Sequence, residues 1–92
     1  MIRSFRNDDT RSLFEDILVP RWRASERPAR RKLLYLHRAR TLSDLRVPPG
    51  NQLEALKGDR RGQHSIRVNA QWRICFRWSE DGVRDVEIVD YH

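Results

Sequence analysis

The sequence has a single cysteine, Cys75, among its 92 residues. One cysteine cannot form an internal disulfide, and no further thiols or imidazoles stand near it at the spacing of a structural zinc site. Long apolar runs are also missing: the N-terminus has no stretch of signal-peptide length, and nothing approaches the roughly 20 apolar residues that span a bilayer. We therefore expect a cytoplasmic protein, made in a reducing compartment and not inserted into a membrane.

Two further absences exclude whole classes of enzyme. The pair Gly58 and Gly62 lacks the Lys-Ser/Thr ending and the strand-to-helix context of a phosphate-binding loop, so nucleotide hydrolysis is not expected. The three histidines, His37, His64 and His92, fall in three different predicted elements and show no metal-ligand spacing. We expect no metal, no cofactor and no cysteine chemistry, with Cys75 packing passively.

What is present fits one small globular domain covering residues 1–92. Hydrophobic residues make up 38% of the chain and charged residues 35%. A domain of this size buries roughly two-thirds of the surface that its unfolded chain exposes, which allows one modest core but no large internal cofactor cavity.

Arginine dominates the charge. Lys and Arg number 19 against 13 Asp and Glu, for a net charge of +6, and only Lys32 and Lys57 are lysines. A planar guanidinium pairs with phosphate and stacks on bases, which suits nucleic acid; GC-rich coding is the alternative explanation. The charge is regional: residues 21–47 carry +7, residues 57–73 carry +4, and residues 74–92 carry −3. Such regional charge favours a polyanionic partner.

Two helices are predicted in the N-terminal half. Asn7, Asp8 and Asp9 can cap a helix whose apolar stripe is Leu13, Phe14, Ile17 and Leu18, and Pro20 stops it. Ser25 can cap a second helix with Pro28 in its first turn. Its apolar positions recur at three- and four-residue steps, opposite an arginine-rich face that we interpret mainly as solvated. These positions are Ala29, Leu33, Leu36, Ala39 and Leu42.

Strand patterns occupy the two ends of the chain. Residues 2–5 form a short, half-apolar first strand, and residues 45–51, with Pro48, Pro49 and Gly50, form a loop. Period-two alternation begins at residues 65–69 and resumes at residues 72–78, joined by a short link at residues 69–71. The turn at residues 80–82 leads to a last strand at residues 86–89.

The predicted fold is α+β in the order β-α-α-β-β-β. Two helices cover one face of a small, mostly antiparallel four-stranded sheet. The opposite face is expected to be open and lined by Arg67, Arg73, Arg77 and Glu87. We expect function on this open face.

Several polar residues could cleave RNA through its own 2′-hydroxyl. That reaction needs a base, an acid for the leaving 5′-oxygen, and cations that stabilise the phosphorane. Asp90 and His92 can act as base and acid, Lys57 and Arg73 can hold the phosphate, and Tyr91 can bond the phosphate or stack on a base.

Each assignment has a structural alternative. Arg73 could instead form a cross-strand ion pair with Glu87, Asp90 could pair with an arginine, and a terminal His92 could be disordered. Counting by twos from Ile88 also puts Asp90 and His92 on the buried face, so the strand must end, bulge or twist near Val89 for these side chains to reach Arg73.

The residues that carry this chemistry also form a known pattern. The run of residues 53–78 contains Leu56-Lys57-Gly58-Asp59-Arg60 and Trp72-Arg73-Ile74, and the chain closes with Asp90-Tyr91-His92. Together with residues 2–5 and 45–51, these segments resemble the HigB toxins of the RelE superfamily over essentially the whole chain.

The resemblance implies a fold, an activity and partners. Toxins of this family are type II toxins, ribosome-dependent endoribonucleases that cut mRNA in the ribosomal A site and are silenced by HigA, a helix-turn-helix antitoxin. The fold implied is RelE-like, operator DNA would be bound only through the antitoxin complex, and ribosomal RNA would be a contact. The catalytic positions carried over are Lys57, Arg73, Asp90, Tyr91 and His92. From charge we add the RNA-binding candidates Arg60, Arg61, Arg67 and Arg77.

One position departs from the pattern. Some family members have a histidine where this chain has Glu54, so acid–base roles move onto Asp90 and His92, and His64 is not an assured replacement. The alternative function is a noncatalytic module of the same fold that binds RNA or an antitoxin. A DNA-binding regulator is the weaker third hypothesis, because the predicted helices form no convincing helix-turn-helix.

Overall fold

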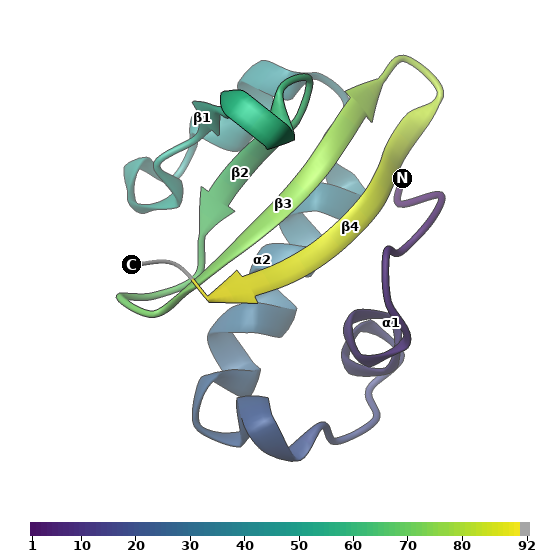
Figure 1. The fold of residues 1–92 in the computed structure, drawn as a ribbon, viewed down its shortest axis with the longest axis vertical. Helices are drawn as coiled ribbons and strands as arrows, with labels where there is room; N and C mark the ends of the chain where they lie inside the picture. The colour runs from purple at the N-terminus through teal and green to yellow at the C-terminus, as the bar shows by residue number, and fades with distance from the viewer. Residues whose placement is uncertain (91–92) are drawn as a thin grey trace.

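A computed structural model describes residues 1–90 of the chain (Figure 1). Two α-helices, α1 (Asp8–Phe14) and α2 (Glu26–Arg38), precede four strands: β1 (Glu54–Ala55), β2 (His64–Arg67), β3 (Trp72–Ser79) and β4 (Gly82–Asp90). The strands form one antiparallel sheet in the order β1-β2-β3-β4. The α+β class, the two helices and the four-stranded antiparallel sheet are confirmed. The candidates Tyr91 and His92 lie outside the described residues.

Short 3₁₀ helices connect these elements. They are η1 (Pro20–Ser25), η2 (Leu42–Arg46), η3 (Pro49–Asn51) and η4 (Gly58–Arg60). Thr41 and Asp44 form a reciprocal capping box at the start of η2, in the segment around the predicted proline loop. Among residues 1–90, no helix combines the length and the apolar character needed to cross a membrane.

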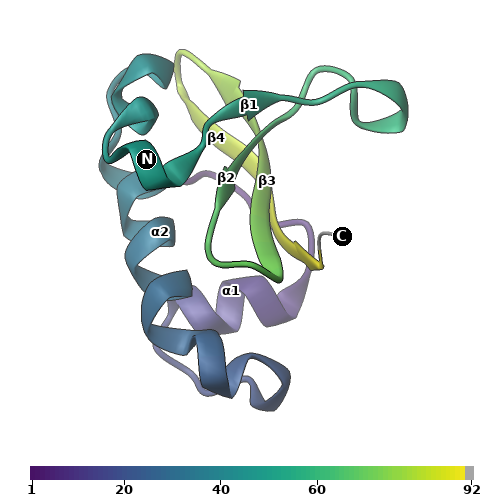
Figure 2. The same ribbon diagram turned by 90° about the vertical axis from the view of Figure 1, so that its left-hand side faces the viewer.

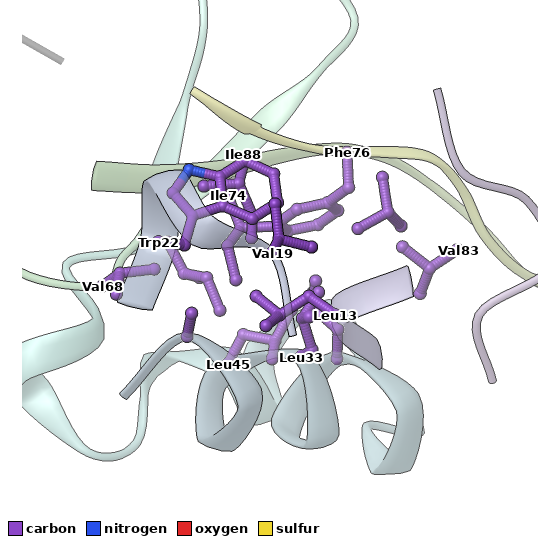
Figure 3. Close-up of a cluster of buried hydrophobic side chains, with 14 residues drawn as sticks. Leu13, Val19, Trp22, Leu33, Leu45, Val68, Ile74, Phe76, Val83 and Ile88 are labelled. Atoms are coloured by element: carbon purple, nitrogen blue, oxygen red, sulfur yellow. The ribbon is translucent and has the colours of Figure 1, made fainter. Parts of the chain in front are cut away.

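The core lies between the helices and one face of the sheet (Figure 3). Leu13 of α1 and the α2 stripe are in one cluster with the inward residues of the strands. The fully buried members include Leu33, Leu36, Ile74 and Phe76, as the three- and four-residue and period-two spacings predicted. Val19 and Trp22, from the segment between the helices, close the same cluster.

The predicted first strand was wrong. Residues 2–5 touch β4 only through two isolated parallel bridges, Ile2 to Val83 and Phe5 to Val86. Regular pairing fails because β4 is irregular there: its register with β3 shifts between Cys75 and Arg77, and Asp85 adopts a positive φ of 54°. The fourth strand is instead β1, a two-residue polar segment without apolar alternation.

The first helix is shorter than predicted. Asn7 caps it as expected, its Oδ1 accepting from the Thr10 amide at 2.8 Å. The helix ends at Phe14, and Asp16 takes a left-handed φ of 70°. Ile17 and Leu18 therefore leave the helical stripe and are 54% and 49% exposed.

The second helix begins differently from the prediction. The side chain of Ser25 makes no cap, because η1 runs directly into α2. Its Oγ accepts a hydrogen bond from Nδ2 of Asn69 at 2.9 Å instead. Ser25 thus ties the β2–β3 turn to the start of α2.

Candidate functional site

The sheet face away from α2 is only partly open, which corrects the prediction: the Arg77 side chain is 47% exposed, but the face is covered further along β3. Arg73 is 5% exposed and Cys75 is 3% exposed, although both alternate with core residues along β3. β1 and the excursion of residues 56–63 that connects it to β2 bring polar groups against this face. Figure 2 shows the excursion on the opposite side of the sheet from α2.

Arg73 is held by fixed polar partners. Its Nε donates to Oγ of Ser65 at 2.9 Å, and its Nη2 donates to the Gln52 carbonyl at 2.6 Å. Oε1 of Glu54 lies 3.8 Å from Nη2. The side chain is therefore a buried cation of set orientation beside one half-exposed carboxylate. Among residues 1–90, Glu54 is an acidic neighbour of Arg73, where sequence reasoning had offered Glu87.

Glu87 serves other arginines. Its Oε1 accepts from Nη1 of Arg60 at 3.0 Å, and its Oε2 lies 3.7 Å from Nε of Arg6. Glu87 pairs with Cys75 in the sheet register, so Arg60 reaches from η4 across this face. Burial is the main cause that raises the pKa of the Cys75 thiol, which disfavours the reactive thiolate and agrees with passive packing.

Lys57 stands at the start of η4. Its side chain is exposed, and its carbonyl accepts from the Arg60 amide at 3.3 Å. The following Gly58 has a φ of 63°, in the left-handed region that glycine adopts without steric cost. The Lys57-Gly58 pair thus combines an exposed cation with a turn that projects from the sheet.

The strand register separates Asp90 from Arg73. Asp90 lies opposite Trp72, and Val89 lies opposite Arg73. Side chains of directly paired residues share a face, so Asp90 and Arg73 start from opposite faces of the sheet, as the count by twos predicted. Asp90 is exposed, and Nε2 of Gln71 donates to its Oδ2 at 3.4 Å.

The other basic candidates differ in their surroundings. Arg77 is half-exposed: its Nε lies 3.4 Å from Oδ2 of Asp85, and its Nη1 would be 3.0 Å from a Cβ at Gly62 of the excursion. Arg61 is exposed at the end of η4. Arg67 is half-buried at the end of β2, opposite Arg73.

His64 has a packing role. It is the first residue of β2, and its ring stacks on Phe76 with 6.2 Å between centroids. The strand register places His64 on the face of the sheet that Phe76 shares, which is the helix side. Within residues 1–90, no group of three or more His, Cys, Asp or Glu side chains is arranged to hold a metal ion.

Sequence reasoning missed the groups that position Arg73. Ser65 has the same strand parity as Arg67, so a correct register would have placed it beside Arg73. Gln52 contributes only its backbone carbonyl, from a left-handed conformation with φ 45°. No side-chain pattern reveals that contact.

Comparison with known proteins identifies the family. The family model for RelE-like toxins of the type II toxin–antitoxin system HigB matches residues 2–92. This chain belongs to the HigB-like toxin family. The resemblance drawn from the sequence is thereby confirmed.

Individual relatives match over shorter stretches of this HigB-like chain. It is 50% identical over 62 residues to Toxin HigB-1 of Vibrio cholerae, covering 67% of this chain and 64% of that protein. It is 44% identical over 41 residues to Endoribonuclease HigB of Proteus vulgaris, covering 45% of each. The match thus spans less than two-thirds of these relatives' length.

A solved structure supports the fold alone. The YoeB-YefM complex from Staphylococcus aureus has a similar chain with a TM-score of 0.55 and 17% sequence identity. The alignment covers 100% of this chain and 98% of that one. HigB-like and YoeB chains therefore share the RelE-like arrangement of helices and sheet.

Proposed function

We propose that this chain is the toxin of a type II toxin–antitoxin pair and acts in the cytoplasm as a ribosome-dependent mRNA endoribonuclease. Family membership and the similarity to a protein named Endoribonuclease HigB support this function. Its partners would be a HigA-type helix-turn-helix antitoxin, mRNA in the ribosomal A site and ribosomal RNA. Operator DNA would be bound only through the antitoxin complex.

The observation that carries the proposal is the fixed guanidinium of Arg73. A cation whose hydrogen bonds to Ser65 and Gln52 already set its position needs little reorganisation when negative charge develops on a phosphate. Arginine stays charged even when buried, which lysine does not ensure. Arg73 thus suits transition-state stabilisation better than a flexible surface cation would.

The reaction we propose uses no metal ion. A base removes the proton of the 2′-hydroxyl, the 2′-oxygen attacks the adjacent phosphorus, and the bond to the 5′-oxygen breaks as an acid protonates that oxygen. Asp90 and His92 are the proposed base and acid, in an order left open, and Tyr91 bonds the phosphate or stacks on a base. Lys57 and Arg73 hold the phosphate.

The proposed RNA-binding arginines differ in the interactions that they would lose on binding RNA. Arg61 is exposed, so contact with an RNA backbone requires only desolvation. Arg60 and Arg77 already pair with Glu87 and Asp85, so RNA phosphates would have to compete with these carboxylates. We therefore rank Arg61 above both, with Arg67 contributing from the end of β2.

The first test is cleavage of an mRNA on translating ribosomes by the purified protein, with the new 5′ ends mapped. Lys57→Ala removes an exposed cation of the proposed site, and Arg84→Gln removes one that pairs with Asp81 elsewhere. We expect Lys57→Ala to cut about 100-fold more slowly, the scale of losing one group that stabilises the transition state. Arg84→Gln should cut like the unmodified chain.

Arg73→Lys tests whether cleavage needs the fixed guanidinium, because the variant keeps a positive charge but loses the fixed geometry. It should be slow even when its circular dichroism and urea unfolding show a folded protein. Folded protein that leaves mRNA intact on translating ribosomes would refute the endoribonuclease and favour the noncatalytic module. Equal cutting of ribosome-free RNA would refute ribosome dependence.

A further inference from the structure

The helical side of the molecule carries arginines without acidic partners. Arg23, Arg27, Arg31 and Arg38 are exposed, and none lies within 4.0 Å of a carboxylate in the described part of the chain. Glu26 is the only acidic residue between Asp16 and Asp44, in a stretch with eight cationic residues. Glu26 is itself engaged by Arg30. The positive charge here is thus left uncompensated by the protein.

Three of these arginines lie on one line of α2. Arg27, Arg31 and Arg38 are spaced by four and seven residues, which places them on one stripe of the helix. With a rise of about 1.5 Å per residue, the stripe spans about 16 Å. We call these three residues the α2 stripe. Figure 2 shows α2 on the opposite side of the sheet from the excursion that carries Lys57.

A second observation shows that positive charge accumulates beside the stripe. Lys32 is nearly buried, and its pKa is lowered first by burial and then by the charges of Arg31 and Arg67. Its ammonium donates to Oδ1 of Asn51, a neutral acceptor. Three cations therefore lie close together without a carboxylate, an arrangement that a bound anion would stabilise.

We propose that the α2 stripe, flanked by Arg23, binds the phosphate backbone of duplex RNA on the side of the molecule opposite the candidate catalytic face. The inference rests on the proposed function, since a toxin that acts on the ribosome meets structured RNA as well as the strand that it cuts. Each arginine that neutralises a phosphate releases condensed counterions, which gives affinity without reading sequence.

The chemistry of the stripe favours a duplex over a single strand. Single-stranded binding sites combine cations with aromatic platforms on which bases stack. The large hydrophobic side chains exposed among residues 1–90 are aliphatic: Met1, Ile17, Leu18, Leu34 and Val47. The aromatic ring nearest the row on α2, Tyr35, is half-buried and packs against the core. A row of cations without a fully exposed ring fits the phosphate ridge of an A-form helix.

The same row fits a protein partner poorly. Protein interfaces centre on buried apolar or aromatic residues and are depleted of charge there. On the line of the stripe, Leu34 is the one large apolar side chain that is exposed, at 41%, within the described part of α2. Nucleic acid is therefore the occupant that the charge and composition of this surface select.

The test compares two double variants of equal net charge. Arg27→Gln/Arg31→Gln removes two unpaired arginines, and Arg11→Gln/Arg84→Gln removes two that pair with Asp8 and Asp81. Binding to an RNA duplex of about 16 base pairs is measured by fluorescence anisotropy at several salt concentrations. The stripe variant should reduce the magnitude of the slope of log affinity against log salt by about 1.8, or about 0.9 for each of the two arginines. The control variant should change it by much less.

Three results would overturn the proposal. Equal losses of RNA affinity in both double variants would mean that net charge alone matters. Unchanged RNA binding but weaker antitoxin binding by the stripe variant would make the stripe an antitoxin surface, and tighter binding of the unmodified protein to a DNA duplex of the same length would exclude RNA as the preferred partner. Cleavage is measured on the same preparations. If the protein cleaves mRNA but the two double variants bind RNA alike, only this inference is refuted. A stripe effect without any cleavage leaves the inference standing and refutes the proposed endoribonuclease.

Discussion

Lys32 combines a core position with a charge. It is 9% exposed on α2, and its ammonium donates to Oδ1 of the fully buried Asn51. Nδ2 of Asn51 in turn donates to the carbonyls of Leu45 and Val47. Lys32 thus fastens the η2–η3 segment to α2, although burial and neighbouring cations disfavour its charged form.

This conflict predicts a pH dependence of stability. The lowered pKa means that folded Lys32 releases its proton at a lower pH than the unfolded chain, whose value is 10.5. Between the two values the unfolded state binds more protons, so the free energy of unfolding rises with pH through that window. Relative to Lys32→Met, the unmodified protein should gain stability as pH rises towards 10.5 in urea unfolding. A pH-independent difference would contradict the shift.

Arg73 shows which properties of a single residue could be predicted from the sequence and which could not. Alternation with Trp72 and Ile74 correctly assigned its face of the sheet. Its burial could not be predicted, because the groups that enclose it come from Gln52 and from Glu54 of a two-residue strand without alternation. Hydrophobic periodicity predicts the apolar face of a sheet and does not reveal polar cover on the other face.

At the scale of elements, long periodic segments were predicted well and short ones poorly. The stripe of α2 and the alternation of β3 each bury several side chains, so many contacts agree with one pattern. Residues 2–5 have the composition of a strand, yet β4 offers them only isolated parallel bridges. Whether a short segment pairs depends on the irregularity of its neighbour, which the segment's own residues do not encode.

Gly82 of β4 lies in close contact with the N-terminal segment, so a substitution there tests how tightly the two pack. Its φ is 146°, and a Cβ there would lie 2.7 Å from the Met1 carbonyl oxygen and 2.5 Å from Cγ of Arg3. The Met1 oxygen also accepts from the Val83 amide at 2.9 Å, so it cannot retreat without losing that bond. Gly82→Ala should therefore destabilise the protein by about 1–3 kcal/mol in urea unfolding.

Gly50→Ala is the matched control, since no atom lies within 4 Å of a Cβ at that position. We expect its effect to stay within about 0.5 kcal/mol. Equal stabilities of the two variants would mean that residues 1–3 do not pack against the β3–β4 turn as described.

At the scale of the whole molecule, the arginines on the sheet side and those on the α2 side differ in their pairing with carboxylates. On the sheet side, arginines face carboxylates of β1, β4 and the adjoining turn: Arg60, Arg73, Arg77 and Arg84. On the α2 side, the exposed arginines of the stripe face solvent. The chain therefore has two basic surfaces of different character, one ordered by internal ion pairs and one available to an external polyanion.

This distribution predicts that moderate salt stabilises the fold. At 0.01 M salt the screening length is about 30 Å, close to the longest dimension of 31 Å, so all uncompensated cations repel one another. At 0.1 M it is about 10 Å, which weakens that repulsion but spares ion pairs whose atoms lie within 4.0 Å. The free energy of unfolding, measured with urea, should rise between these two NaCl concentrations.

The two double variants locate the source of that rise. Arg27→Gln/Arg31→Gln removes uncompensated charge, so its stability should depend less on salt than that of the unmodified chain. Arg11→Gln/Arg84→Gln removes charge already offset by Asp8 and Asp81, so it should lose less of the salt effect. A fall in stability with added NaCl would mean that surface ion pairs outweigh the repulsion, contrary to the small contribution expected of exposed pairs. Chloride is the appropriate anion, because sulfate and phosphate also stabilise folded proteins through their exclusion from protein surfaces.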